Sequence, residues 1–394
     1  MESITVVGGG LGGLTAAIAA AEQGASVDLY EGHQTLGGRA RSSEGPYTAN
    51  DGPHVFYDNG PHWSWLASRG LVTPAARAPL GALAKLRFRH QGRLVALPPS
   101  DLAKLLVKRK VVAPVDRSLR DWAGEQFGAE SARLMAGLLG AVTFDHDAGR
   151  LSAAFGWERF LRTTALKYPS ARYVLGGWQA TVGKFAAHAR QLGVRIHTGH
   201  RVDTIPDGPT IVATSLDAAR QLLGDDTLRW ESGRTALLDL AVRQDKRDLF
   251  LVFDLDQAAF YERFSAADPS VVPAGESLVQ AQQPLRPGES KADGIARLEG
   301  LIDLAMPGWR DRVTWRREAI AHCRTGALDL PGTTWRDRPA IDRGDGVYLV
   351  GDQVAAPGLL SEVAIASARE AAKLAVDRLG DNLEKSHTRR SAAG

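Results

Sequence analysis

The chain begins with a pattern that few folds accommodate, in which an apolar strand, a glycine-rich turn and an alanine-rich helix follow one another directly. The run from Ile4 to Val7 is typical of a buried parallel strand. The glycines after it have the spacing G-x-G-x-x-G, at Gly8, Gly10 and Gly13. The first permits a tight turn, the second lets the backbone approach a pyrophosphate, and the third lets the helix pack on the strand. The pattern therefore predicts a dinucleotide-binding βαβ unit, with a phosphate at the positive end of the helix.

The next segment completes this unit. A helix is predicted from Leu11 to Gln23, and Leu11 and Gly12 in its first turn are expected to contact the ligand. A second strand follows from Ser26 to Tyr30, and Glu31 comes directly after it. An acidic side chain at this place can accept hydrogen bonds from ribose hydroxyls and disfavours a 2′-phosphate. The strand, the helix, the second strand and the acidic residue follow one another in the order and spacing of a βαβ unit. This agreement argues against a chance glycine turn.

The composition indicates a globular protein without a cysteine-based redox site. Hydrophobic residues make up 44% of the 394 residues and charged residues 24%, which is ordinary for a globular protein. The longest uncharged apolar stretch, Leu11 to Ala21, is too short to span a bilayer, and we expect a cytoplasmic protein. Cys323 is the only cysteine, so the sequence predicts no disulfide and no metal site, and we interpret Cys323 as a small buried thiol. Redox chemistry would have to come from a bound cofactor.

Patterning along the chain predicts an α/β protein in which a discontinuous, Rossmann-like binding domain carries an inserted α+β substrate domain. Between residues 60 and 175, helical patterns occur at Ser118 to Gly128 and Glu130 to Gly140. Alternating apolar runs in residues 236–335 predict a mixed or antiparallel sheet with one or two helices. We assign residues 1–70, 175–235 and 336–380 to the binding domain, 71–174 and 236–335 to the substrate domain, and 381–394 to a flexible tail.

Two further motifs are expected to reach the same ligand. A glycine doublet at Gly37 and Gly38 allows backbone to lie against a planar group, and Arg39 and Arg41 offer positive charge beside it. Near the end of the chain, YLVGDQ places Gly351 and Asp352 just after a strand, where the carboxylate could bind a ribityl hydroxyl. The helix after it offers its N-terminus to the pyrimidine edge of a flavin.

Taken together, these motifs give the chain a family likeness. It resembles the FAD-dependent amine oxidase and phytoene desaturase superfamily through VVGGGLGGL, YEGHQTLGGRARS, DGPHVF, GGWQATVGKFA, HTGHRV and YLVGDQ, all in order. The resemblance implies FAD, and because Cys323 is the only cysteine we expect the FAD to be bound non-covalently. The resemblance also implies backbone contact of Val202 with adenine, flavin contacts from Gly37 to Arg41, a ribityl contact from Asp352, and further cofactor contacts from Leu359 and Leu360.

Within this superfamily the chain looks more like the carotenoid and squalene desaturases than like the monoamine oxidases, because DGPHVF occurs together with FDHDAGRLSAAFGWERF. Its turn after the GD motif, QVAAPGLLSEVAIAS, departs from the glycine-rich turn of that branch. The resemblance implies hydride transfer to flavin from a hydrophobic, isoprenoid-like substrate. An oxidase of amines or amino-acid derivatives that produces peroxide is the alternative. A non-catalytic prenyl- or lipid-binding protein of the same fold is a third, which the intact glycine fingerprint disfavours.

Candidate catalytic groups are few. His54 could act as a base or polarise the substrate near neutral pH, and the alternative is a structural histidine bonded to backbone. Asp239 interrupts an apolar strand and could be a buried general base, although a solvent-facing position is the favoured interpretation. Four tryptophans could line a pocket for a large apolar substrate or belong to ordinary cores: Trp157, Trp178, Trp309 and Trp315.

The stretch from residue 85 to 120 is strongly basic, with ten lysines and arginines against two aspartates. Within it, DLAKLLVKRKVVAPV alternates apolar and basic residues. Such a segment could lie on an anionic membrane surface and admit a lipid-soluble substrate. The alternative is a solvated helix face beside an anionic cofactor. No nucleic-acid-binding module is recognisable in the sequence, so we expect no nucleic-acid partner.

Overall fold

A five-stranded parallel sheet organises the first half of the fold. The computed structural model describes residues 3–51, 55–164 and 170–391. The sheet has the order β15-β9-β1-β2-β8, with every pair parallel, and its strands are β1 (Ile4–Val7), β2 (Val27–Glu31), β8 (Arg195–Thr198), β9 (Thr210–Val212) and β15 (Val347–Leu349). Residues 1–70, 175–235 and 336–380, assigned above to the binding domain, supply all five strands. The predicted α/β class with a discontinuous Rossmann-like sheet is confirmed.

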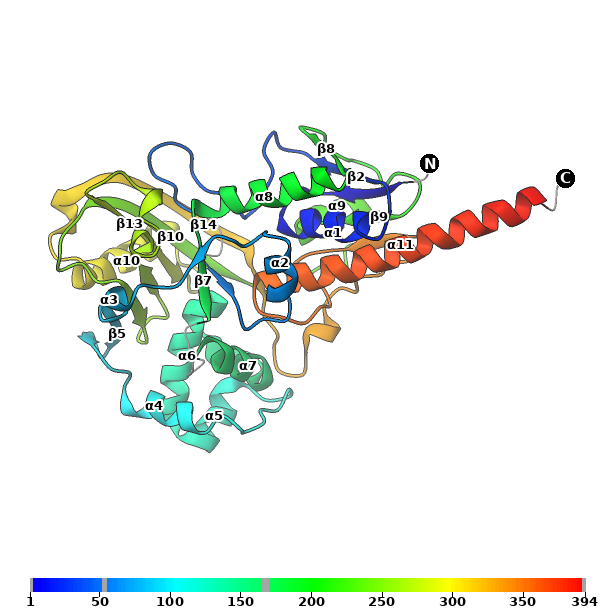
Figure 1. Ribbon diagram of the computed structural model, residues 1–394. Helices are drawn as coiled ribbons and strands as arrows, with labels where there is room; N and C mark the ends of the chain where they lie inside the picture. Colours follow the sequence, from blue (N-terminus) through cyan, green and yellow to red (C-terminus); the bar gives the residue numbers. More distant parts are fainter. Residues whose placement is uncertain (1–2, 52–54, 165–169, 392–394) are drawn as a thin grey trace.

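Three helices pack together against this sheet: α1 (Leu11–Ala21), α8 (Gly177–Gln191) and α11 (Ser361–Ser391). α1 contacts both of the others, and Figure 1 shows the three lying side by side. Fully buried alanines such as Ala17 in α1 and Ala372 in α11 allow close approach of the helices. The short helix α9 (Leu216–Leu223) packs on β9 and β15 through Ala219.

The edge of the parallel sheet carries an ion pair between neighbouring strands. Arg195 on β8 donates two hydrogen bonds to the carboxylate of Asp28 on β2, at 2.6 and 2.5 Å. These hydrogen bonds lower the pKa of Asp28 to about 2, from its ordinary value of 3.8. Arg195 is half exposed, so solvent weakens the pair.

Asp28→Asn is therefore expected to lower the free energy of unfolding at pH 7 by about 0.5–1 kcal/mol. A depressed pKa in the folded state stabilises the protein only while the carboxylate is ionised. The difference between wild type and variant should thus be complete above about pH 4 and shrink as the pH falls towards 2. Urea denaturation at several pH values measures it, with exposed Asp207→Asn as control. A difference that does not vary with pH would contradict the assigned role of the ion pair.

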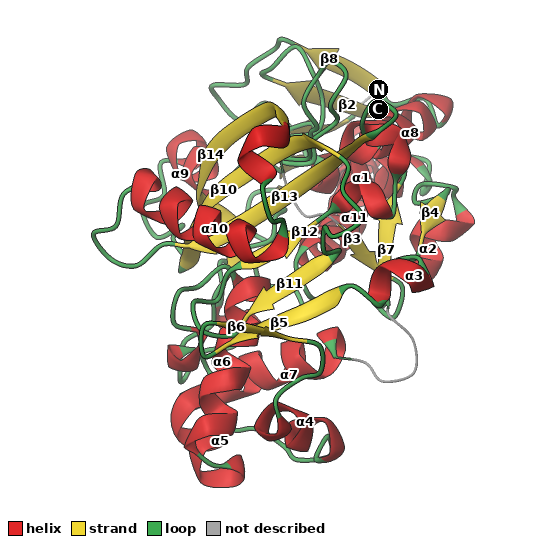
Figure 2. Ribbon diagram, turned by 90° about the vertical axis from the view of Figure 1, so that its left-hand side faces the viewer, coloured by secondary structure: helices red, strands yellow, loops and turns green. Residues whose placement is uncertain are grey.

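A seven-stranded mixed sheet forms the second half of the fold, in the order β14-β10-β13-β12-β11-β5-β6. Only β11 and β5 pair in parallel. Helix α10 (Lys291–Ala305) packs on this sheet through residues such as Leu298 and Ile302. Figure 2 shows the helix lying against the strands. The strands are β5 (Leu86–His90), β6 (Arg93–Val95), β10 (Ser232–Arg243), β11 (Leu251–Asp254), β12 (Phe260–Glu262), β13 (Glu276–Pro284) and β14 (Val313–Ala327).

A group of helices lies beyond the edge of the mixed sheet (Figure 2). Its members are α4 (Ser100–Val107), α5 (Leu119–Phe127), α6 (Ala129–Thr143) and α7 (Ala153–Thr163). The two helices predicted in this region are confirmed as α5 and α6. Gly128 between them has φ of 95°, a conformation that glycine adopts without strain. A shared core that includes Trp122, Met135 and Trp157 joins these helices.

A small three-stranded sheet with the order β3-β7-β4 completes the fold. It consists of β3 (Val55–Tyr57), β4 (Ala75–Ala76) and β7 (Ala171–Val174), and the short helices α2 (Trp63–Ser68) and α3 (Leu80–Leu83) lie in the same part of the chain. Its strands come from both sides of the domain boundary predicted at residue 70.

Helix α11 is longer than the sequence patterning suggested. Residues 381–391, expected to belong to a flexible tail, continue the helix, and Figure 1 shows its C-terminal part extending away from the body of the protein. The segment contains good helix formers and no proline, so nothing in it interrupts the helical hydrogen bonds. Among the described residues, no helix is both long and apolar enough to cross a lipid bilayer.

Candidate cofactor site

The glycine turn between β1 and α1 is built by backbone packing that excludes side chains. A Cβ atom on Gly13 would lie 1.9 Å from the carbonyl oxygen of Gly8, and one on Gly8 would lie 2.6 Å from the carbonyl oxygen of Ala213. α1 begins after Gly10 with no side-chain cap and no acidic residue in its first turn. Its first N–H groups and its positive dipole end are therefore available to an anion such as a pyrophosphate.

The second glycine pair lies directly against this turn. Gly37 donates a backbone hydrogen bond of 2.9 Å to the carbonyl oxygen of Gly9, and Gly10 and Gly37 form an isolated parallel bridge. A Cβ atom on Gly10 would lie 3.9 Å from the Cα atom of Gly38. The structure thus brings the two glycine motifs of the sequence into one strip of bare backbone, to which a flat or phosphorylated ligand can approach closely.

Glu31 is fixed at the carboxyl end of β2, beside the glycine turn. Its carboxylate accepts backbone hydrogen bonds from Gly9 at 2.8 Å and His33 at 2.9 Å, and it lies 2.8 Å from His33 Nδ1. Burial opposes ionisation, but these hydrogen bonds outweigh it and lower the pKa of Glu31. His200 donates a backbone hydrogen bond to the carbonyl oxygen of Glu31, which brings the segment that contains Val202 to the same strand end.

Arg39 and Asp352 join the two ends of the chain. Arg39 Nη1 donates to Asp352 Oδ2 at 2.6 Å, and Nη2 donates to Oδ1 at 2.8 Å, so the pair is bidentate. Burial of Asp352 is outweighed by the charge of Arg39 and its hydrogen bonds, which lower the pKa of the carboxyl group. Arg41, two residues along, has a buried Nε atom that finds no hydrogen-bond partner in the described part of the chain. The structure places the predicted ribityl-binding carboxylate next to the second glycine motif.

The turn before α11 contains Leu359 and Leu360, and an ion pair that the sequence did not indicate holds it in place. Arg162 on α7 donates to both carboxylate oxygens of Glu362, at 2.5 and 2.6 Å, and the backbone N–H of Leu359 donates to Glu362 Oε2. Glu362 was recognisable in the sequence only as an acid in the first turn of a helix. Its partner lies 200 residues earlier in the chain.

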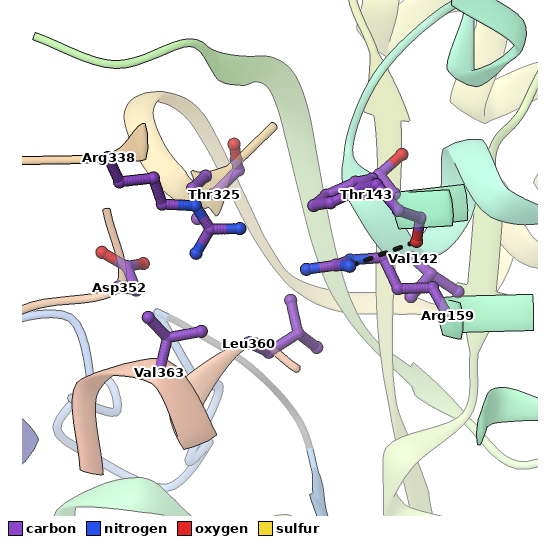
Figure 3. A pocket seen from close by; sticks show the side chains of 11 residues that line it. Val142, Thr143, Arg159, Thr325, Arg338, Asp352, Leu360 and Val363 are labelled. Carbon is purple, nitrogen blue, oxygen red and sulfur yellow. Dashed lines mark hydrogen bonds between the residues drawn. The ribbon is translucent and has the colours of Figure 1, made fainter. Parts of the chain in front are cut away.

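A pocket lies between the C-terminal motif and the helices of the substrate region (Figure 3). Asp352, Leu360 and Val363 line one side of it, and Thr143 on α6 and Arg159 on α7 line the other. The remaining lining residues are Val142, Phe155, Thr325, Gly326, Ala327 and Arg338. Predicted cofactor residues therefore share a pocket with side chains from both inserted segments. The arginines Arg159 and Arg338 were not predicted, because each looks like an ordinary surface charge in the sequence.

The predicted catalytic residues are placed differently. His54 lies outside the described residues. The favoured solvent-facing position of Asp239 is wrong, because only 4% of this residue is exposed. Its carboxylate accepts hydrogen bonds from Gln280 Nε2 at 2.9 Å and Arg317 Nε at 2.8 Å. Asp239 is not among the residues that line the pocket of Figure 3, and a catalytic role for it stays a prediction.

The aromatic and thiol candidates belong mostly to ordinary packing. Trp157, Trp178 and Trp309 are each buried in a hydrophobic core. Trp315 is partly buried and stacks on Tyr47 with ring centroids 5.5 Å apart. The expectation of a buried Cys323 is wrong, since its side chain is half-buried at the edge strand β14.

The residues present fit an FAD molecule. Two glycine motifs provide bare backbone beside an uncapped helix N-terminus, and an ionised Glu31 lies at the neighbouring strand end where ribose hydroxyls could donate to it. Asp352 and the Leu360 turn lie farther along, next to the pocket. When bound there, FAD would supply hydride acceptance at its flavin ring.

Comparisons with known proteins agree with this arrangement. Residues 6–70 match the family of NAD(P)-binding Rossmann-like domains. The carotenoid 3,4-desaturase of Haloarcula japonica is 48% identical over 62 residues, which span 16% of this chain and 11% of the desaturase. An oxidoreductase from Methanosarcina mazei has a TM-score of 0.75 at 18% identity, over 94% of this chain and 100% of the other.

A second solved structure, cyclohexylamine oxidase from Brevibacterium oxydans, has a TM-score of 0.70 at 17% identity, over 96% of this chain and 99% of the oxidase. The fold is therefore shared over nearly the whole length, while the sequence likeness to the desaturase is confined to a short segment. Both agree with the resemblance found in the motifs. The chain thus contains a Rossmann-like dinucleotide-binding segment, and it shares its overall fold with these two oxidoreductases.

Proposed function

We propose that this protein is an FAD-dependent oxidoreductase that removes a hydride from an organic substrate held in the pocket beside Asp352. The observation that carries the proposal is the continuity of the site. The glycine strip, Glu31, the Arg39–Asp352 pair and the Leu360 turn lead from the phosphate end of the βαβ unit to a pocket lined by the substrate region. The protein would supply binding, orientation and electrostatics, and the flavin would accept the electrons.

Dehydrogenation of a carbon–carbon bond in a hydrophobic substrate is the reaction we favour. Val142, Phe155, Leu360 and Val363 give the pocket an apolar part, and the short sequence match is to a carotenoid desaturase. Oxidation of an amine or amino-acid derivative is the second candidate, supported by the fold of cyclohexylamine oxidase. A non-catalytic lipid binder is disfavoured, because every glycine and both carboxylates expected at the cofactor are present.

Flavin uptake tests the proposal directly. The purified protein is expected to be yellow, with flavin absorbance bands, or to become so when the flavin-free protein is incubated with FAD. Denaturation should release the flavin into solution, because Cys323 lies on β14 of the substrate sheet and the sequence offers no other cysteine for a thioether link. Size-exclusion chromatography followed by absorbance measures the bound fraction. A folded protein that stays colourless with excess FAD would overturn the proposed function.

The two candidate reactions differ in what reduces the flavin. Anaerobic bleaching of the flavin by an isoprenoid, without peroxide release on a panel of amines, would support dehydrogenation. Peroxide release with an amine, and no bleaching by isoprenoids, would support the oxidase. Both assays use the same flavin-loaded protein, and neither requires a second protein as electron acceptor.

We also propose that the basic stretch at residues 85–120 contacts an anionic membrane surface. Three of its apolar side chains are strongly exposed: Leu97 at 78%, Val107 at 83% and Val112 at 87%. Val107 is the last residue of α4, and Leu97 and Val112 lie before and after this helix, in the same stretch as Lys108 and Lys110. Exposed apolar residues next to cations suit a surface of acidic headgroups and acyl chains.

Liposome flotation tests this membrane contact. The protein is expected to float with vesicles that contain acidic lipid and to remain in solution with neutral vesicles. Replacing Leu97, Val107 and Val112 together by serine should abolish flotation, whereas Ile320→Ser, at a site that is 41% exposed on β14, should leave it unchanged. Equal failure to float with both kinds of vesicle would exclude the contact.

A further inference from the structure

Arg159 is a buried cation whose nearest counter-charge is half exposed and beyond hydrogen-bond distance. It belongs to α7, and only 6% of its surface is exposed. Among the described residues, its one side-chain hydrogen bond goes from Nη1 to the carbonyl oxygen of Phe155, at 3.2 Å. The nearest carboxylate oxygen, on half-exposed Glu158, lies 3.7 Å from Nη1. Burial lowers the pKa of Arg159 to about 10, so the side chain still carries its charge at neutral pH.

Arg338 approaches the same space from the other side. It is 4% exposed, and its Nε and Nη2 atoms donate to the two carboxylate oxygens of Asp329, at 2.9 and 2.8 Å. Its third nitrogen, Nη1, is buried and has no hydrogen-bond partner among the residues that the structure describes. Figure 3 shows the guanidinium groups of Arg338 and Arg159 pointing into the pocket from opposite sides.

The carboxylates near these two arginines do not neutralise both of them. Asp352 is held by Arg39 in a bidentate pair, and Asp329 is held by Arg338. Glu158 is half exposed and beyond hydrogen-bond distance of Arg159. A second pocket adjoins the first and shares Phe155, Arg159 and Arg338 with it. Both cavities therefore meet at the Arg159 guanidinium, most of whose N–H groups donate no hydrogen bond to a described residue.

We propose that Arg159 and Arg338 form an anion-binding subsite for a carboxylate group of the substrate. A guanidinium presents N–H donors in a flat fork that matches the two oxygens of a carboxylate. The ring of Phe155 lies under the Arg159 guanidinium, 3.3 Å from Cζ to the ring centroid, and holds it in place. The identification of the bound carboxylate as part of the substrate rests on the proposed function, whereas the binding of an anion at these arginines does not.

This subsite narrows the substrate class. The pocket combines two arginines with apolar groups from Val142, Leu360 and Val363. A neutral hydrocarbon would leave Arg159 buried with only half-exposed Glu158 near it, and it would offer no acceptor to the buried Nη1 of Arg338, which is costly. An amphipathic acid would place its carboxylate between the arginines and its apolar part against the remaining wall, beside Asp352 and the predicted flavin-contacting turn.

Ligand-induced stabilisation tests the subsite without turnover. The probe is benzoate, with neutral benzamide as its isostere and inorganic phosphate as a second anion. Benzoate is expected to raise the Tm of the wild-type protein in a concentration-dependent way, because a ligand that binds only the folded state stabilises it. Benzamide should have no effect. The measurement is made on flavin-free and on FAD-loaded protein, and benzoate should also shift the visible spectrum of the loaded form.

Variants assign the effect to the pocket. Arg159→Met is expected to weaken the apparent affinity for benzoate at least tenfold, and Arg159→Lys should retain part of it. Arg120→Met, which removes a surface arginine paired with Asp147, should bind benzoate as the wild type does. Since Arg159 has no ion pair within hydrogen-bond distance, Arg159→Met should remain folded, which circular dichroism checks.

The outcomes separate this subsite from the proposed function. Benzoate binding that depends on Arg159 in a protein that takes up no FAD would retain the subsite and overturn only the oxidoreductase. Equal stabilisation of wild type and Arg159→Met would overturn the subsite, as would a response to phosphate but none to benzoate. Loss of benzoate binding once FAD is loaded would also overturn it, because the anion would then occupy the place of the cofactor.

Discussion

Gly13→Ala is expected to yield a protein that has lost at least nine-tenths of its flavin and is less stable by about 2 kcal/mol. The added methyl group would lie 1.9 Å from the backbone oxygen of Gly8, well inside van der Waals contact. The obstacle is backbone, so no side-chain rotation relieves it and the turn must move. That movement separates the N–H groups of the turn from the phosphate position at the start of α1.

The matched control is Gly183→Ala, which makes the same change in a second helix. Gly183 lies on the exposed face of α8, and a Cβ atom there would meet nothing within 4 Å. This variant should bind flavin normally and gain up to about 1 kcal/mol, since alanine favours the helix over glycine. Absorbance after gel filtration measures flavin content, and urea denaturation measures stability. Normal flavin content in Gly13→Ala would argue that the cofactor does not use this turn.

Asp329→Asn is expected to lower the free energy of unfolding by about 3–5 kcal/mol. The side chains of Asp329 and Arg338 are 5% and 2% exposed, and the carboxylate accepts two charge-assisted hydrogen bonds. Asparagine keeps the shape but removes the negative charge, which leaves a guanidinium buried without a counter-ion. The loss far exceeds that of a surface pair, because water cannot replace the missing carboxylate.

Asp203→Asn provides the comparison for this ion pair. Asp203 also pairs with an arginine, Arg201, but the two side chains are 74% and 78% exposed. The change should alter stability by less than about 0.5 kcal/mol. Denaturant unfolding of both variants at neutral pH measures the difference. Similar small losses in the two variants would mean that solvent reaches Arg338 in solution, and would contradict the buried position of this ion pair.

The cofactor half of the protein was predictable because its signals are local. The turn at Gly8, Gly10 and Gly13, the strand ends and Glu31 depend on residues within about 30 positions of one another, and the chemistry of a βαβ unit dictates their spacing. The parallel sheet, the helices α5 and α6 and the mixed second sheet followed from the same kind of periodicity.

The position of Asp239 shows what the alternation of polar and apolar residues along a strand does not predict. Alternation along β10 separates the two faces of a strand, but it does not say whether anything covers the second face. In the structure, Gln280 and Arg317 surround the carboxylate, and both also bind the backbone carbonyl of Asn50, from a segment far away in sequence. A residue expected in solvent is therefore buried.

By itself, the sequence determined the dinucleotide-binding unit and the α/β class with a discontinuous Rossmann-like sheet, and its motifs resemble those of the amine oxidase and desaturase superfamily. Only the tertiary structure decided that Arg39 meets Asp352, that Arg162 holds the Leu360 turn, and that Arg159 and Arg338 face one pocket. The physical reason is that the two kinds of feature depend on different parts of the chain. A phosphate turn is a backbone conformation that nearby glycines specify, whereas the burial and partners of a charged side chain depend on elements that the chain brings together only on folding.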